Sequence, residues 1–168
     1  MDSTQVEERS VIIDLDPWEY EHASDVGIRR FTANWGKQDA AHYDKSRMEP
    51  DRTAQVAACL CELAVAKHLN QYWSGHVWPG SEHHKYKHLA DVGTSIEVRR
   101  VRTRNAVAVR KHQVGNGLVL WAARVIDPEF TSVELLGWID YDTGWHTGNE
   151  SGFNDNTRYV PLDSLEKP

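Results

Sequence analysis

The order of hydrophobic and polar positions predicts helices in the first half of the chain. Asp16-Pro17-Trp18-Glu19 is a typical helix start, with a capping aspartate, a proline at the first helical position and a glutamate that completes a capping box. This helix is predicted to end at Gly27. Residues 52–72 are rich in Ala and Leu, contain no Gly or Pro, and predict the longest helix. The polar residues 32–50 predict a loop.

Strands are predicted from residue 95 onward. Ser95 to Arg99 alternates, so that Ile96 and Val98 share one face and Glu97 and Arg99 the other. Three more strands are predicted over residues 106–109, 118–126 and 133–139. The Gly115-Asn116-Gly117 segment predicts a hairpin between the first two of these.

The last part of the chain predicts less regular structure. Residues 141–157 are rich in Gly and Asn and predict a long loop, followed by an edge strand over residues 159–161. The predicted fold class is therefore α/β of the α+β kind, with a central mixed β-sheet flanked by helices. The length of 168 residues fits a single domain spanning residues 1–168, with residues 1–15 as a flexible or edge segment.

Composition excludes several classes of protein. Hydrophobic residues make up 40% and charged residues 26%, which is ordinary for a globular chain. No run approaches the roughly 18 apolar residues of a membrane span, and the polar N-terminus does not resemble a signal peptide, so we expect an intracellular protein without a membrane partner. Cys59 and Cys61 should be buried thiols that point to different sides of their helix, not a disulfide or a zinc site.

Charge is unevenly distributed along the chain. The net charge is −6, with 11 acids against 6 basic residues in residues 1–50 and 9 against 2 in residues 127–168. From Arg99 to Ile126 there is no acid. A basic stripe of this kind can bind phosphates despite the global sign, or form a solvated strand face. The nucleic-acid-binding candidates within it are Arg100, Arg102, Arg104, Arg110 and Lys111.

Three acids have the pattern of a metal site. Glu62 lies among apolar positions of the long helix, where a carboxylate is costly unless it is paired, metal-bound or turned to solvent. The Asp91-Val92-Gly93-Thr94 segment predicts a tight reversal that brings Asp91 near Glu97 across two strands. The two carboxylates could then share one divalent cation such as Mg²⁺. Arg99, on the same strand face as Glu97, could offset charge in a transition state.

These residues resemble the PD-(D/E)XK nucleases, the restriction-endonuclease-like superfamily. Asp91 followed by Glu97-Val98-Arg99 is similar to the family signature, and Cys61-Glu62-Leu63-Ala64-Val65-Ala66-Lys67 is similar to the preceding helix in phage exonucleases and RecB-like nucleases. Glu21 to Gly27, Gly137-Trp138-Ile139 and Val160-Pro161-Leu162-Asp163-Ser164-Leu165 resemble further segments of small phage-encoded members. The resemblance covers most of residues 16–165.

The resemblance implies a nuclease that hydrolyses DNA phosphodiester bonds with Mg²⁺ or Mn²⁺ and a metal-activated water, in the cytoplasm of a phage-infected bacterial host. It implies Asp91 and Glu97 as catalytic metal ligands and Glu62 as a third. Arg99 stands where the family has lysine, and a guanidinium is a poor general base because it stays charged. Lys111, His88, His112 and Gln113 are candidate auxiliary residues.

Several alternatives stay open at the level of sequence. His83, His84, His88 and Asp91 could bind zinc, although exposed loop histidines are the expected state of the cluster that also contains His76. A non-catalytic nucleic-acid-binding protein, or a phage protein that blocks a host factor, could use the same scaffold. RNA as a substrate and a homodimer are also open.

Overall fold

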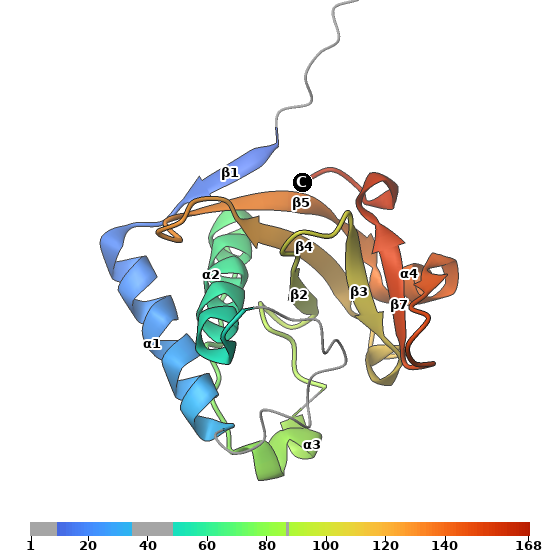
Figure 1. The fold of residues 1–168 in the computed structure, drawn as a ribbon, viewed down its shortest axis with the longest axis horizontal. Coiled ribbons are helices and arrows are strands. Elements are labelled where there is room, and N and C mark those ends of the chain that lie inside the picture. Colours follow the sequence, from blue (N-terminus) through green and yellow to red (C-terminus); the bar gives the residue numbers. More distant parts are fainter. Residues whose placement is uncertain (1–9, 35–48, 87) are drawn as a thin grey trace, which may run out of the picture.

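The structure, a computed structural model, describes residues 10–34, 49–86 and 88–168. It shows the predicted α+β class, with a mixed four-stranded sheet, a second sheet of three strands and flanking helices (Figure 1). The helices are α1 (Pro17–Ala33), α2 (Asp51–Leu69), α3 (His83–Tyr86) and α4 (Tyr141–Thr147), with short 3-10 turns η1 (Gly80–Glu82), η2 (Lys111–Gln113) and η3 (Leu162–Ser164).

The first sheet has the strand order β1-β5-β4-β2. Its strands are β1 (Val11–Asp14), β2 (Ile96–Arg100), β4 (Val119–Val125) and β5 (Ser132–Asp140). β2 runs parallel to β4, and the other two pairings are antiparallel. β1 is thus an edge strand, one of the two arrangements expected for residues 1–15, of which residues 1–9 lie outside the described part. β2 forms the opposite edge of the sheet.

The second sheet has the order β3-β7-β6, with β3 (Ala106–Arg110), β6 (Asn149–Glu150) and β7 (Thr157–Pro161). The predicted hairpin between residues 106–109 and 118–126 is therefore wrong. β3 pairs with the distant β7, whereas β4 pairs with β2 and β5. Gly115 and Gly117 do have the positive φ of a turn, but that turn joins strands of different sheets. The predicted edge strand near the C-terminus is instead the middle strand.

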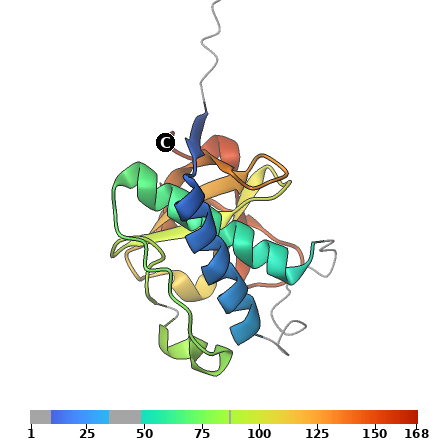
Figure 2. The ribbon, with the colours of Figure 1, turned by 90° about the vertical axis from the view of Figure 1, so that its left-hand side faces the viewer.

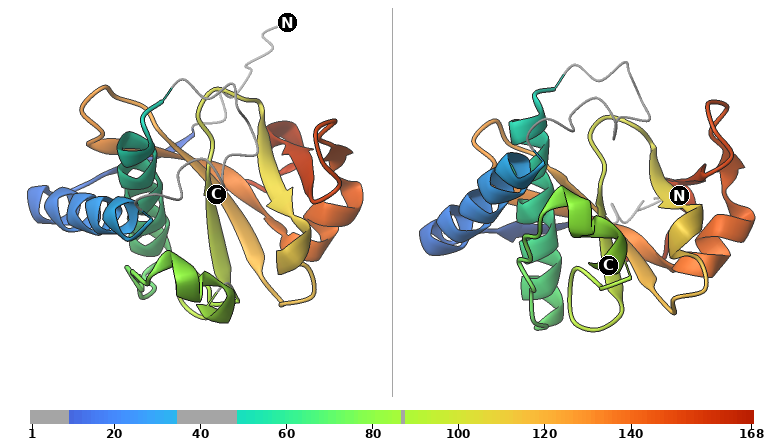
Figure 3. Two further views of the ribbon diagram at one scale, coloured as in Figure 1. Left: turned by 60° about the horizontal axis from the view of Figure 1, so that its bottom comes forward. Right: turned by 90° about the horizontal axis from the view of Figure 1, so that it is seen from below.

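Each face of the first sheet packs on its own core, because the strands alternate. On one face Val98, Trp121 and Leu135 pack against α1 and α2. On the other face Leu120 and Ile139 pack against α4 and the second sheet. Figure 3 shows α1 and α2 on one side of β2, and β3 with β7 on the other. Cys59 and Cys61 are buried and unbridged, as predicted, and burial raises the pKa of the Cys61 thiol to about 12.

The first helix does not end at Gly27, as predicted, but continues to Ala33. A Cβ at Gly27 would lie 2.5 Å from the Cα of Val56, so the glycine serves the close crossing of α1 and α2 (Figure 2). The extra turns place Arg30 near α2. The start of the helix is as predicted, with both hydrogen bonds of the capping box present at Asp16. The second helix is shorter than predicted, because Asn70 adopts a left-handed conformation at φ 51°.

The predicted loop over residues 141–157 is also partly wrong, because it contains α4 and β6. Asp140 caps α4 by accepting a hydrogen bond from the Thr143 N–H at 2.9 Å. Tyr141 and Trp145, one helical turn apart, are both buried in the second core. Tertiary packing thus stabilises a helix in a segment whose composition favours loops.

Most of the predicted loop over residues 32–50 lies outside the described residues. Among the described residues, no helix is long and apolar enough to cross a membrane.

Candidate functional site

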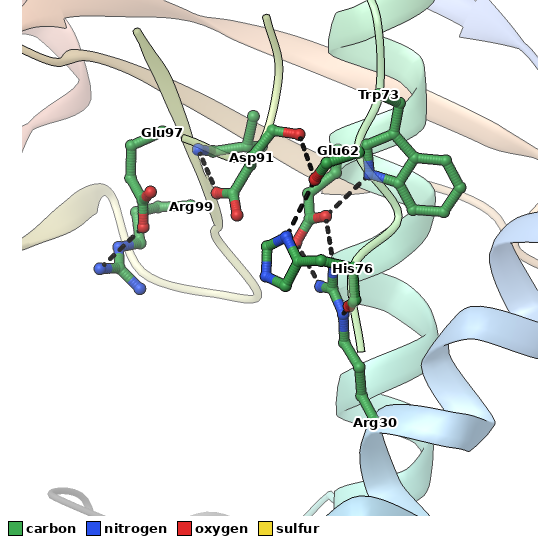
Figure 4. A network of polar contacts seen from close by, with 9 residues as sticks. Arg30, Glu62, Trp73, His76, Asp91, Glu97 and Arg99 are labelled. Atoms are coloured by element: carbon green, nitrogen blue, oxygen red, sulfur yellow. Dashed lines mark hydrogen bonds and ion pairs between the residues drawn. The ribbon is translucent and has the colours of Figure 1, made fainter. Parts of the chain in front are cut away.

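A cavity of about 490 Å³ lies beside β2, the last strand in the order of the first sheet. Helices α1 and α2 border it on one side, and β3 borders it on the other. The charged and hydrogen-bonding residues that line this cavity include Arg30, Glu62, His76, Asp91, Glu97 and Arg99. We call Arg30, Glu62 and Trp73 the helical side of the site, and Asp91, Glu97 and Arg99 its strand side. Figure 4 shows both.

Asp91 is positioned by the predicted reversal. The N–H groups of Asp91 and Val92 donate to the Ile96 carbonyl at 3.0 and 3.1 Å, and Gly93 takes the required positive φ of 56°. The N–H of Val98 in β2 donates to the Asp91 carboxylate at 2.9 Å. This hydrogen bond holds the Asp91 side chain against β2. The predicted approach of Asp91 to Glu97 across the turn is thus present.

The carboxylate of Asp91 is in an unfavourable electrostatic environment. It is buried, and the hydrogen bond from Val98 is the one its side chain makes within the described residues. Burial raises the pKa of Asp91 well above its usual range, and the charges of Glu62 and Glu97 raise it further. Such a group needs a proton or a cation to offset it.

Glu97 and Arg99 lie on the same face of β2, as the alternation predicts. They form an ion pair at 3.1 Å. Arg99 also donates to the amide oxygen of Gln113, and Tyr141 O–H donates to the same oxygen at 2.8 Å. The guanidinium is therefore held in place, but its Nε is buried and finds no partner among the described residues. Gln113, a predicted auxiliary residue, thus contacts the site.

Glu62 is buried, so the solvated alternative is wrong. Arg30 donates two hydrogen bonds to its carboxylate, at 2.7 and 3.0 Å, and the indole N–H of Trp73 donates a third at 2.9 Å. A buried carboxylate here was expected to be paired or metal-bound, and in the structure it is paired with Arg30. Sequence reasoning missed Arg30, which lies 32 positions away in the chain, because the first helix was expected to end before it.

The acids fit a magnesium-type site only in part. Within the described ranges, no three His, Cys, Asp or Glu side chains are arranged to hold a metal ion by themselves. Magnesium commonly uses one or two carboxylates and completes its shell with water and phosphate. Asp91 and Glu97 place two carboxylates on the strand side, of which Glu97 already pairs with Arg99. Glu62 is engaged by Arg30, so its role as a third ligand stays a prediction.

The predicted phosphate-binding residues are in different environments. Arg100 and Arg102 both pair with Glu49, with two hydrogen bonds from Arg100. Arg104 lies over the ring of Tyr159, 4.7 Å from its centroid. Arg100 and Arg110 line the cavity, whereas Lys111 is exposed outside it. The basic stripe is therefore not one continuous solvated strand face.

The predicted histidine cluster does not form one site. His84, His88 and His112 are exposed and do not line the cavity, and the side chain of His83 lies outside the described part. His76 differs from the expected exposed loop histidine, because it is half-buried and lines the cavity. Its position after the long helix gave no periodic signal that would have identified it.

Comparison of the chain with known protein families, with curated proteins and with solved structures finds no match.

Proposed function

We propose that the chain is a metal-dependent nuclease of the PD-(D/E)XK type that hydrolyses DNA phosphodiester bonds, with Mg²⁺ or Mn²⁺ held by Asp91 and Glu97. The observation that carries this proposal is the environment of Asp91. Its buried carboxylate faces a cavity, has two carboxylates nearby that raise its pKa, and accepts one main-chain hydrogen bond. A divalent cation would offset that charge and leave positions for water and phosphate.

The chain's own groups supply the rest of a phosphate site. Arg99 is oriented by Glu97 and Gln113, and its guanidinium lines the cavity, where it can donate hydrogen bonds to a phosphate oxygen. Arg100 and Arg110 add positive charge to the same cavity. These groups favour the extra negative charge that develops on a phosphate during hydrolysis.

When bound, the cation would neutralise the scissile phosphate and activate the attacking water. Asp91 and Glu97 would hold the cation, and Arg99 would orient the phosphate. The helical side would fix the walls of the cavity through the Arg30–Glu62 pair. The resemblance to small phage-encoded nucleases supports a place in the cytoplasm of an infected bacterial host.

A second candidate is a non-catalytic DNA-binding protein on the same scaffold. The observation that favours it is the direct Glu97–Arg99 ion pair at 3.1 Å, which already compensates one of the two proposed ligands. In this case the guanidinium would bind phosphate without hydrolysis.

Cleavage of plasmid and linear DNA, with Mg²⁺ or Mn²⁺ and with EDTA, tests the proposal. We expect metal-dependent cleavage by the wild-type protein and its loss in Asp91→Asn and Glu97→Gln. The matched control is Asp155→Asn, because Asp155 is exposed and lies outside the cavity.

Calorimetry with Mn²⁺ alone separates the two candidates. Manganese binding that is lost in Asp91→Asn, together with cleavage, supports the nuclease. DNA binding without metal binding or cleavage supports the second candidate and overturns the first.

A further inference from the structure

We propose that His76 is the general base of the nuclease reaction, and that it occupies the functional place of the lysine that Arg99 replaces. This inference rests on the proposed function. His76 lies in the segment between α2 and η1 and lines the same cavity as Asp91, Glu97 and Arg99. Figure 4 shows its imidazole between the helical side and Asp91.

Ser74 links the ring of His76 to the main chain of Asp91. The hydroxyl of Ser74 lies 2.9 Å from Nδ1 of His76, and it donates to the main-chain carbonyl of Asp91 at 3.3 Å. A hydroxyl has one proton, so when Ser74 donates to that carbonyl it can accept from Nδ1–H. In this tautomer the neutral ring carries its lone pair on Nε2, which is the form the proposed step uses.

The ring is also held in a fixed orientation. It stacks on Trp78 with centroids 3.8 Å apart and planes 3° from parallel, and Trp78 stacks in turn on Tyr86 at 4.8 Å. The main-chain carbonyl of His76 accepts a hydrogen bond from Arg30 Nε at 2.9 Å. A base whose ring is fixed by other groups is the arrangement that general-base catalysis requires.

The other groups of the cavity are less suited to accept a proton. Arg30, Arg99, Arg100 and Arg110 are guanidinium groups, which remain charged. The carboxylates of Glu62 and Glu97 are ion-paired. Among the described residues that line the cavity, His76 is the one histidine, and histidine as a residue type changes its charge near neutral pH.

In the proposed step, Nε2 of His76 takes one proton from water while the oxygen of that water forms a bond to phosphorus. The bond from phosphorus to the leaving oxygen breaks, its electron pair stays on that oxygen, and the oxygen takes a proton from solvent. The imidazolium then returns its proton to solvent. Among the described residues, the charged side chains that line the same cavity are Arg30 from α1, Glu62 from α2, Asp91 from the turn before β2, Glu97, Arg99 and Arg100 from β2, and Arg110 from β3.

Single-turnover cleavage of linear DNA by full-length His76→Gln and His76→Ala, measured from pH 5 to 9 at saturating Mn²⁺, tests this role. We expect a loss of about 10²- to 10⁴-fold in rate. We also expect the acidic limb of the wild-type pH profile to disappear in both variants, and added imidazole to restore cleavage by His76→Ala. His146→Gln is the matched control, because His146 is exposed on α4 outside the cavity.

Mn²⁺ calorimetry on each variant shows whether it is folded and binds metal. A His76→Gln protein that binds Mn²⁺ and keeps the wild-type rate and acidic limb overturns the role of His76 and leaves the proposed function intact. Unaltered metal binding with no imidazole rescue of His76→Ala also overturns it. A wild-type protein that binds Mn²⁺ but does not cleave DNA overturns the proposed function.

Discussion

The buried carboxylates on the two sides of the cavity differ in their hydrogen-bond and ion-pair partners. On the helical side, Glu62 accepts three hydrogen bonds, two of them from a guanidinium. On the strand side, the Asp91 carboxylate is also buried, but within the described residues it accepts one hydrogen bond, from a neutral main-chain N–H. A buried charge with matched partners stabilises a fold only modestly, yet it is costly to disrupt. A buried charge without such partners is typical of a site that binds or transfers something.

The three acids therefore differ in how available they are to bind a cation. The family resemblance implies all three carboxylates as metal ligands. In the structure Arg30 pairs with Glu62, whereas the Asp91 carboxylate forms no ion pair among the described residues. Under the proposed function, the helical side is therefore a support and the strand side is the reactive part. Substitutions on the two sides should therefore have different consequences, in stability on one side and in chemistry on the other.

The largest effect should follow removal of Arg30. Arg30→Ala leaves the Glu62 carboxylate buried without its cation, and we expect the free energy of unfolding to fall by about 3–5 kcal/mol. Denaturation in urea measures this. The matched control is Lys85→Ala, because Lys85 and Glu82 form an exposed pair at 3.5 Å that should contribute at most about 1 kcal/mol.

A double variant sharpens this result. Arg30→Met with Glu62→Leu removes both charges, and we expect it to regain most of the lost stability because no charge is left buried and unpaired. A loss below about 1 kcal/mol in Arg30→Ala, or no recovery in the double variant, would contradict the supporting role of the helical side.

The next effect concerns Arg99 on the strand side. Arg99→Ala should lower the rate of cleavage by about 10²- to 10³-fold, because it removes a charge that stabilises the transition state, and should largely spare metal affinity. We expect Arg99→Lys to cleave more slowly than the wild type, since a single ammonium cannot reproduce the hydrogen-bonding fork of a guanidinium. Single-turnover rates at saturating Mg²⁺ measure both variants. Wild-type cleavage by Arg99→Ala would remove this residue from the site.

A smaller effect, in stability, should follow Asp91→Asn. Burial and the two nearby carboxylates raise the pKa of Asp91 in the folded protein above its ordinary value of 3.8. Between those two pKa values the folded state binds more protons than the unfolded state, so this group's contribution to stability falls as pH rises through that window. The uncharged asparagine avoids this loss. We therefore expect Asp91→Asn to melt above the wild type at pH 7, and the difference to disappear as the pH falls to about 4.

Added metal should reverse that order. A cation that binds only the folded state adds stability of about 2.7 kcal/mol at 100 times its dissociation constant. Mg²⁺ should therefore raise the melting temperature of the wild type and leave that of Asp91→Asn unchanged, which melting curves with and without Mg²⁺ measure. An equal rise in both proteins would place the cation elsewhere.

The strand side could be predicted from the sequence because it depends on local structure. Asp91, Glu97 and Arg99 lie within nine residues, and a glycine turn followed by strand alternation fixes their relative positions. Glu62 could be recognised as an acid that needs a partner, because the amphipathic pattern of its helix shows it among apolar positions. The fold class followed from the same periodicities.

The features that the sequence did not predict depend on contacts between distant segments of the chain. Arg30 reaches Glu62 only because Gly27, which resembles a helix end, lies in a helix crossing. β3 pairs with β7 across about 50 residues, whereas the glycine turn after β3 predicts pairing with its neighbour. α4 is stabilised by the burial of Tyr141 and Trp145, which local composition does not show. His76 belongs to a loop that tertiary structure folds onto the cavity.

The smallest effect concerns DNA contacts at the border of the strand side, in the loop between β2 and β3. Arg104 is exposed there, above the ring of Tyr159, whereas Arg100 is mostly buried and paired with Glu49. If Arg104 contacts one phosphate, Arg104→Ala should weaken DNA binding slightly and reduce the slope of log affinity against log salt by about 0.9. Titrations in EDTA at several salt concentrations measure this without cleavage.

Arg124→Ala is the control, because Arg124 pairs with Glu134 on β5 outside the cavity and its removal should leave the slope unchanged. Arg100→Ala should lower stability more than it changes the slope, and an unchanged slope in Arg104→Ala would move the DNA contact away from this loop.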